Sequence, residues 1–168
     1  MTTLIESASL INEFREIVEA VFKYMLDLPI TVEEEQVQQA PEALQSSVQL
    51  RGDWNGMVII QCSREVAGLF AEHFLSTCAE DIPEALVLDV LRELANIVAG
   101  NLKFALGPHI ELSAATPRPL IAADMPKDSN VEQCARLRCA AGPFCIALVV
   151  DPTRSLQGSY GLQSPGAS

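Results

Sequence analysis

The sequence lacks any apolar run that approaches the roughly 20 residues needed to cross a lipid bilayer. Its first residues also lack the basic stretch and the following apolar stretch that are typical of a secretory signal peptide. We therefore expect a cytoplasmic protein that does not span a membrane.

Positive charge is scarce as well. The chain has 11 Lys and Arg residues against 22 Asp and Glu residues, which gives a formal net charge of -11. A surface this acidic repels the phosphates of nucleic acids and the head groups of anionic lipids. We therefore expect neither nucleic acid nor a membrane surface as a partner.

The cysteines and histidines lack the spacing of a metal site. No C-x2-C pair occurs, and His73 and His109 are far apart in the sequence. This argues against a zinc site and against a dithiol redox protein, so we predict no metal ligands. In a cytoplasmic protein we interpret all five cysteines as reduced and mostly as packing residues: Cys62, Cys78, Cys134, Cys139 and Cys145.

What the chain does have is the size and composition of a globular domain. Its 168 residues are 49% hydrophobic and 20% charged, which suffices for one core. After Asp151 the sequence turns to Ser, Gly, Gln and Pro. We predict a single domain over residues 1–151 and a disordered tail over residues 152–168.

Apolar spacing predicts a helix over residues 4–28, which Pro29 ends. Ser63 is placed to cap a second helix that runs to about Ser76. The apolar residues of the first helix are Leu10, Phe14, Ile17, Val18, Val21 and Met25.

Segments rich in β-forming residues predict two hairpins, one from residues 48–51 and 57–60 and one from residues 134–139 and 144–150. Further short strands are predicted at residues 30–32, 110–114 and 120–122. This order of elements predicts an α+β fold, in which an antiparallel sheet packs with long helices.

The longest helix is predicted over residues 82–106, with a capping box from Asp81 and Glu84 and a stop at Gly107-Pro108. Its apolar side comprises Leu86, Val90, Leu94, Ile97, Val98, Leu102 and Ala105. At about 100° per residue, five other residues fall within roughly 80° of arc on the opposite side. We call these residues the stripe: Asp89, Glu93, Asn96, Gly100 and Lys103.

The stripe is open to more than one interpretation. A solvated helix face explains the charges of Asp89 and Lys103. Asn96 and Gly100 fit it less well because both are poor helix formers, Gly costing about 1 kcal/mol relative to Ala in mid-helix. A docking face explains both, since Gly leaves room for a partner's backbone and Asn offers a donor and an acceptor. Packing of Gly100 against the protein's own sheet is a further explanation.

Residues 89–103 resemble the signature helix of the CheX/CheC/FliY chemotaxis phosphatases, with Asp89, then Glu93, then Asn96. The continuation I-x-x-G-N-x-K resembles the CheX branch. The resemblance covers about residues 5–150, including the hairpin before the helix and the strand after it. Pro117 comes one residue earlier than the family's usual proline.

The resemblance implies a CheC/CheX-like fold and a phosphatase that hydrolyses the phospho-aspartate of a CheY-like response-regulator receiver domain. It implies that Glu93 anchors the receiver's lysine and that Asn96 orients the attacking water, much as a glutamine does in small GTPases. Asp89, Gly100 and Lys103 are candidate contacts with the receiver. Mg²⁺ is expected in the partner's active site, and no cofactor is expected in this chain.

Two further expectations concern assembly and class. A non-catalytic CheX-like module that binds a receiver or another signalling protein is the alternative to an enzyme. CheX-like members often pair through their sheets, and only one E-x-x-N helix is present here. Strands 134–139 and 144–150 are expected to leave an exposed edge, so we predict a homodimer formed about a two-fold axis, with its Asn96 stripes facing outward.

Overall fold

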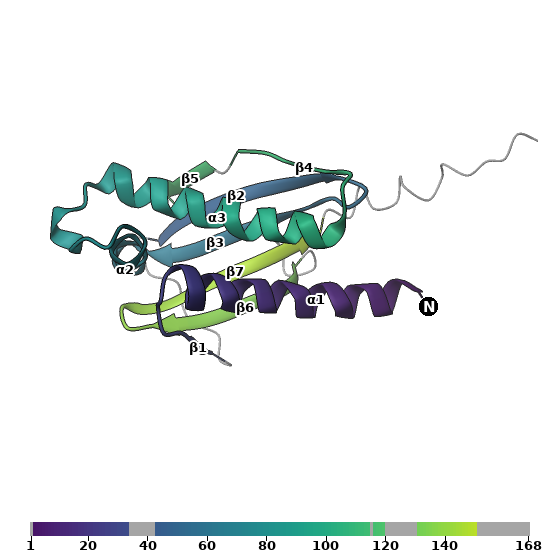
Figure 1. Cartoon of the computed structure of the whole chain (residues 1–168), viewed down its shortest axis with the longest axis horizontal. Helices are drawn as coiled ribbons and strands as arrows, with labels where there is room; N and C mark the ends of the chain where they lie inside the picture. Colours follow the sequence, from purple (N-terminus) through teal and green to yellow (C-terminus); the bar gives the residue numbers. More distant parts are fainter. Residues whose placement is uncertain (1, 34–42, 115, 120–130, 151–168) are drawn as a thin grey trace, which may run out of the picture.

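One antiparallel sheet forms the centre of the fold, and helices lie on one of its faces (Figure 1). The computed structural model describes residues 2–33, 43–114, 116–119 and 131–150. Within them the sheet has seven strands in the order β1-β6-β7-β3-β2-β4, with β5 also paired to β2. This confirms the α+β class. The predicted tail at 152–168, the domain boundary before it and the strand at 120–122 lie outside the described residues.

Both predicted hairpins are present, β2 with β3 and β6 with β7, and each is longer than predicted. β5 was not predicted, because its two prolines break the strand pattern. A strand that pairs on one side only tolerates proline, and β5 pairs with β2 alone. The strands are β1 (Thr31–Val32), β2 (Ala43–Gly52), β3 (Gly56–Ser63), β4 (Ile110–Leu112), β5 (Thr116–Pro119), β6 (Val131–Cys139) and β7 (Gly142–Val150).

The first helix, α1 (Thr2–Ala20), continues into a π-helical turn, η1 (Val21–Met25). The wider turn shifts the apolar face of the helix by about one residue. Phe22 and Leu26 are therefore buried, whereas Met25, which the apolar spacing groups with Phe14 and Val18, is 50% exposed. In the part of the chain that the structure describes, no helix is both long and apolar enough to cross a membrane.

The second helix, α2 (Arg64–Leu75), begins as predicted, because the Ser63 hydroxyl accepts a hydrogen bond from the Val66 amide at 3.1 Å. α2 contacts the sheet at β3 and β7. Phe70 of α2 packs with Phe22 of η1 and Phe144 of β7, with ring centroids 5.0 to 5.2 Å apart. This aromatic cluster joins η1, α2 and the sheet.

The third helix, α3 (Glu84–Leu106), follows the short 3-10 turn η2 (Ala79–Asp81). The predicted capping box is wrong, because Pro83 occupies the N-cap position and no side chain caps the helix. Glu84 instead forms an ion pair with Arg64 at the start of α2. The predicted stop is confirmed, since the helix ends at Gly107, whose φ of 117° favours glycine.

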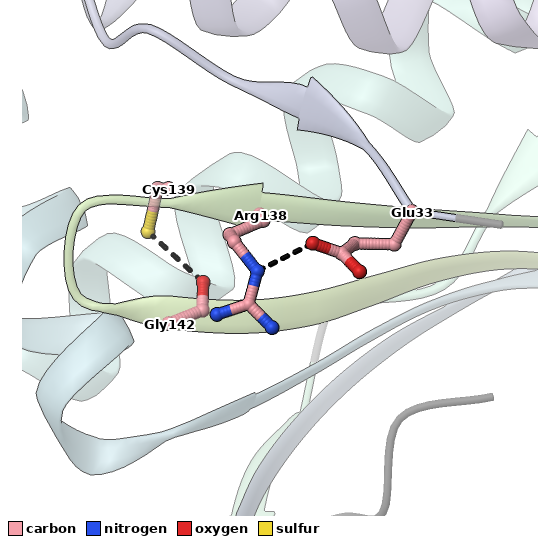
Figure 2. A network of polar contacts seen from close by, with 4 residues as sticks. All are labelled: Glu33, Arg138, Cys139 and Gly142. Atoms are coloured by element: carbon pink, nitrogen blue, oxygen red, sulfur yellow. Dashed lines mark hydrogen bonds and ion pairs between the residues drawn. The ribbon is translucent and has the colours of Figure 1, made fainter. Parts of the chain in front are cut away.

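The edge of the sheet at β1 is short. Thr31 and Val32 pair with Arg138 and Leu137 of β6, and Glu33 forms an ion pair with Arg138 directly after β1 (Figure 2). At the turn between β6 and β7, the Cys139 thiol donates a hydrogen bond to the Gly142 carbonyl at 3.5 Å. These contacts hold the end of β6 that is nearest the turn.

The oxidation state of the cysteines differs from the prediction. Cys145 is disulfide-bonded, so the prediction that all cysteines are reduced is wrong. Cys62, Cys78 and Cys139 are free. Burial, with a smaller effect of the neighbouring Cys139, raises the pKa of the Cys62 thiol to about 12. Because the thiolate is the reactive form, Cys62 is inert, whereas Cys78 is exposed.

We predict that iodoacetamide at about pH 8 alkylates Cys78 in the folded protein and leaves Cys62 unmodified, as measured by peptide mass spectrometry. Unfolding in urea should make Cys62 reactive, because its pKa then returns toward the ordinary value for cysteine. Cys78→Ser is the matched control and should remove the rapid labelling. Similar labelling rates at Cys62 and Cys78 in the folded protein would contradict the prediction.

Candidate functional site

The packing of α3 determines which of its residues face outward. The helix lies over β2 and also contacts β3, β4 and β5 (Figure 1). Leu86 and Ala105, which were predicted on the apolar side, are exposed near the two ends of the helix. The buried residues follow helical spacing: Val90, Leu91, Leu94, Ala95, Val98, Ala99 and Leu102.

The stripe predicted from the sequence lies on the side of α3 opposite this buried face. Asp89 and Glu93 are exposed, and Asn96, Gly100 and Lys103 are half-buried. Asn96 follows Glu93 by three positions, a little less than one helical turn, which places them roughly 4.5 Å apart along the axis. The structure therefore presents a carboxylate and a carboxamide together on one outer face.

The polar contacts along the stripe are few. Asp89 forms an ion pair with Arg92 of the same helix, with 3.4 Å between Oδ1 and the Arg92 Nη2. Among the described residues, the Glu93 carboxylate has no ion pair and the Asn96 side chain has no hydrogen bond. Glu93 and Asn96 are therefore available to a partner, whereas the charge of Asp89 is partly balanced within the helix.

Gly100 lies in open space. A Cβ atom added to it would meet no other atom of the described structure within 4 Å. Its backbone does not have a positive φ, so the helix does not require glycine there. This rules out the explanation that Gly100 is needed for packing against the protein's own sheet. Nothing among the described residues therefore requires glycine at this position.

Sequence reasoning overlooked one residue beside the stripe. Phe104 follows Gly100 by one helical turn and is 92% exposed. An aromatic residue directly after a polar stripe is a signal visible in the sequence, but its exposure depends on the rotation of the helix against the sheet.

The described residues include no group of three or more His, Cys, Asp and Glu side chains that could hold a metal ion. The site as described consists of hydrogen-bonding and charged groups on one helix.

Comparison with known proteins identifies the fold and the family. The family model described as chemotaxis phosphatase CheX matches residues 44–139, more than half of the chain, and the match includes the whole of α3. A search of curated proteins gives no significant match.

Several solved structures are similar. The crystal structure of chemotaxis protein CheX from Vibrio vulnificus has 15% sequence identity and a TM-score of 0.70, covering 86% of this chain and 98% of that one. A CheX–CheY–BeF3–Mg²⁺ complex from Borrelia burgdorferi has 17% identity and a TM-score of 0.65, covering 83% and 96%. FliY from Thermotoga maritima has 14% identity and a TM-score of 0.57, covering 92% and 94%.

These structures share the antiparallel sheet with helices, and the family model covers the helix that carries the stripe. The chain belongs to the CheX family of chemotaxis phosphatases, within the wider CheC/CheX/FliY group.

Proposed function

We propose that this protein hydrolyses the phospho-aspartate of a CheY-like receiver domain in the cytoplasm. The observation that carries the proposal is the pair Glu93 and Asn96, one turn apart on the outer face of α3 and without polar partners among the described residues. Membership of a family of chemotaxis phosphatases supports it. So does the similar protein from Borrelia burgdorferi, whose structure is a complex with CheY, BeF3 and Mg²⁺.

Asn96 positions the attacking water. An acyl phosphate is labile, so the main requirement is to place water in line with the bond between phosphorus and the aspartate oxygen. The Asn96 carbonyl oxygen accepts a hydrogen bond from the water, and its amide donates to a phosphoryl oxygen or to solvent. The water oxygen bonds to phosphorus, the bond to the aspartate breaks, and inorganic phosphate and a free carboxylate result.

Glu93 anchors the receiver. Its carboxylate pairs with the lysine of the receiver's active site, which fixes Asn96 about one turn along the helix, beside the phosphoryl group. Mg²⁺ belongs to the receiver, where it balances the phosphoryl charge, and this chain supplies no cofactor. Asp89, Gly100 and Lys103 contact the receiver further along the stripe.

The open edge of the sheet supports the proposed homodimer, with one change to the prediction. β7 lies between β3 and β6, so it is not an edge strand. β6 is covered where β1 pairs with Leu137 and Arg138 and where the Glu33 amide donates a hydrogen bond to the Arg136 carbonyl. The earlier part of β6 has no strand beside it on that side among the described residues, and two such edges can pair. α3 lies over β2, which is separated from β6 by β7 and β3 (Figure 1). Pairing through β6 therefore leaves the stripe of each of the two copies accessible.

We predict that Asn96→Ala abolishes the acceleration of receiver dephosphorylation, measured as loss of phosphate from a purified phosphorylated receiver. A hundredfold loss corresponds to about 2.7 kcal/mol. Asn101→Ala is the matched control, because Asn101 is on the same helix but about 140° away from Asn96. The control should keep its activity. Full activity of Asn96→Ala would remove Asn96 from the mechanism, and binding without turnover by the unaltered protein would favour the non-catalytic module.

We predict that Glu93→Lys weakens receiver binding strongly, because it replaces attraction to the partner's lysine with repulsion, and like charges in contact cost several kcal/mol. Titration calorimetry measures the affinity. Glu13→Lys, the same charge change on the exposed side of α1, is the control and should bind normally. An unchanged affinity for Glu93→Lys would mean that the receiver docks elsewhere.

We predict a homodimer, which light scattering at micromolar concentration will report as about twice the 18.2 kDa of one chain. Ala135 of β6 is half-buried and packs against the core. A charged residue there, as in Ala135→Lys, should lower the mass toward that of one chain while circular dichroism shows that the fold is kept. A mass of 18.2 kDa for the unaltered protein would contradict the prediction.

A further inference from the structure

Phe104 is the most exposed large apolar side chain in the part of the chain that the structure describes, at 92%. Tyr24, the next, is 75% exposed. An exposed phenylalanine gains none of the free energy that burial would supply. It is also a weaker helix former than the alanine that follows it. Among the described residues, Phe104 therefore stabilises neither the core nor the helix.

The position of Phe104 relates it to the proposed reaction site. It follows Asn96 by eight residues, which is about 12 Å along the helix axis and about 80° around it. By the same count Glu93 is about 60° around from Asn96. Phe104 therefore extends the side of the stripe on which Glu93 lies, and it points away from the core.

Gly100 lies between Asn96 and Phe104, at about 40° around the helix from Asn96. Because a Cβ at Gly100 would meet nothing within the described structure, its absence leaves helix backbone bare between a polar pair and an aromatic side chain. A partner that contacts Asn96 can rest on this backbone and reach Phe104, because Gly100 places no side chain on the line between Asn96 and Phe104. The half-buried Ile97 lies to one side of that line.

We propose that Phe104 is an apolar anchor that the receiver domain buries when it docks on α3. The inference rests on the proposed function, since the occupant is the same receiver that contacts Glu93 and Asn96. It specifies an apolar surface or pocket on the receiver, about 12 Å from the phosphoryl group along the docked helix.

The surface of this chain favours the receiver over a second copy of the chain as occupant. Phe104 is continuous with Glu93 and Asn96 on one helix face, and nothing protrudes between them at Gly100. The open strand edge at β6, which fits a second copy, is separated from the strand beneath α3, β2, by β7 and β3 (Figure 1).

An apolar anchor and a charged anchor affect binding differently. Phe104 does not reach the reacting atoms, so its loss weakens affinity and leaves the maximal rate unchanged. Its contribution depends on buried apolar area and varies little with salt, whereas that of Glu93 is screened as ionic strength rises. Buried aromatic residues at the centre of an interface are frequent hot spots, and we expect Phe104→Ala to weaken binding about tenfold or more.

The test uses a panel of purified CheY-like receivers charged with BeF3 and Mg²⁺, so that binding is measured without turnover. Titration calorimetry compares the unaltered protein with Phe104→Ala, Phe104→Trp and Tyr24→Ala. Tyr24→Ala is the matched control, because it removes an exposed aromatic side chain from η1. We expect Phe104→Ala to raise Kd about tenfold and the other two variants to bind within about twofold of the unaltered protein. In a separate dephosphorylation assay with saturating phosphorylated receiver, we expect Phe104→Ala to keep the kcat of the unaltered protein.

The outcomes separate the anchor from the proposed function. If the unaltered protein binds receivers without dephosphorylating them, the proposed enzyme fails, and the Kd of Phe104→Ala still decides the anchor. An unchanged Kd for Phe104→Ala overturns the anchor alone. If Phe104→Ala instead lowers the mass in light scattering and leaves the Kd unchanged, the occupant is a second copy and the proposal is wrong. If no receiver binds, both proposals fail.

Discussion

The burial of one side of α3 against β2 is the constraint on which the site depends. Val90, Leu94 and Val98 are buried with core residues of β2 such as Val48 and Leu50. Burying a side chain of this size contributes about 1.5 to 3 kcal/mol, so their sum sets the rotation of the helix about its axis. A rotation by one residue, about 100°, would expose part of this core and turn Asn96 toward the sheet. The buried residues of α3 therefore determine which of its other residues face outward.

The fold was predictable where local chemistry decides the structure. The Ser63 cap, the Gly107 stop and the β-hairpins each depend on a few neighbouring residues, and all are present. The predictions that were wrong also have local causes, but the pattern of apolar and polar residues does not show them. The π-helical turn shifted the phase after Val21, so that Phe22 rather than Met25 is buried. Pro83 took the N-cap position from Asp81 and so removed the predicted capping box.

The candidate site was predictable in part, because helical periodicity alone places the stripe on one face and the resemblance to the phosphatases supplies its roles. The roles of Glu93 and Asn96 stay predictions. The sequence could not predict which atoms surround the residues of the stripe and its neighbour Phe104. The open space at Gly100 and the exposure of Phe104 depend on where the sheet lies beneath the helix. The disulfide at Cys145 was missed because the cysteines were interpreted from the expected compartment and not from their neighbours in space.

The open space at Gly100 also has an evolutionary consequence. Alanine would fit there without a clash and would raise the helix propensity by about 1 kcal/mol, so selection for stability alone favours replacing the glycine. Natural proteins stay only modestly stable, and residues that lower stability persist where activity needs them. Protein engineering that replaces helix glycines with alanine to raise stability would therefore select Gly100 early. The variant would have a more stable helix but would lose the bare backbone surface at this position. On the proposed docking of the receiver, Gly100 marks a point on α3 where stability and binding compete.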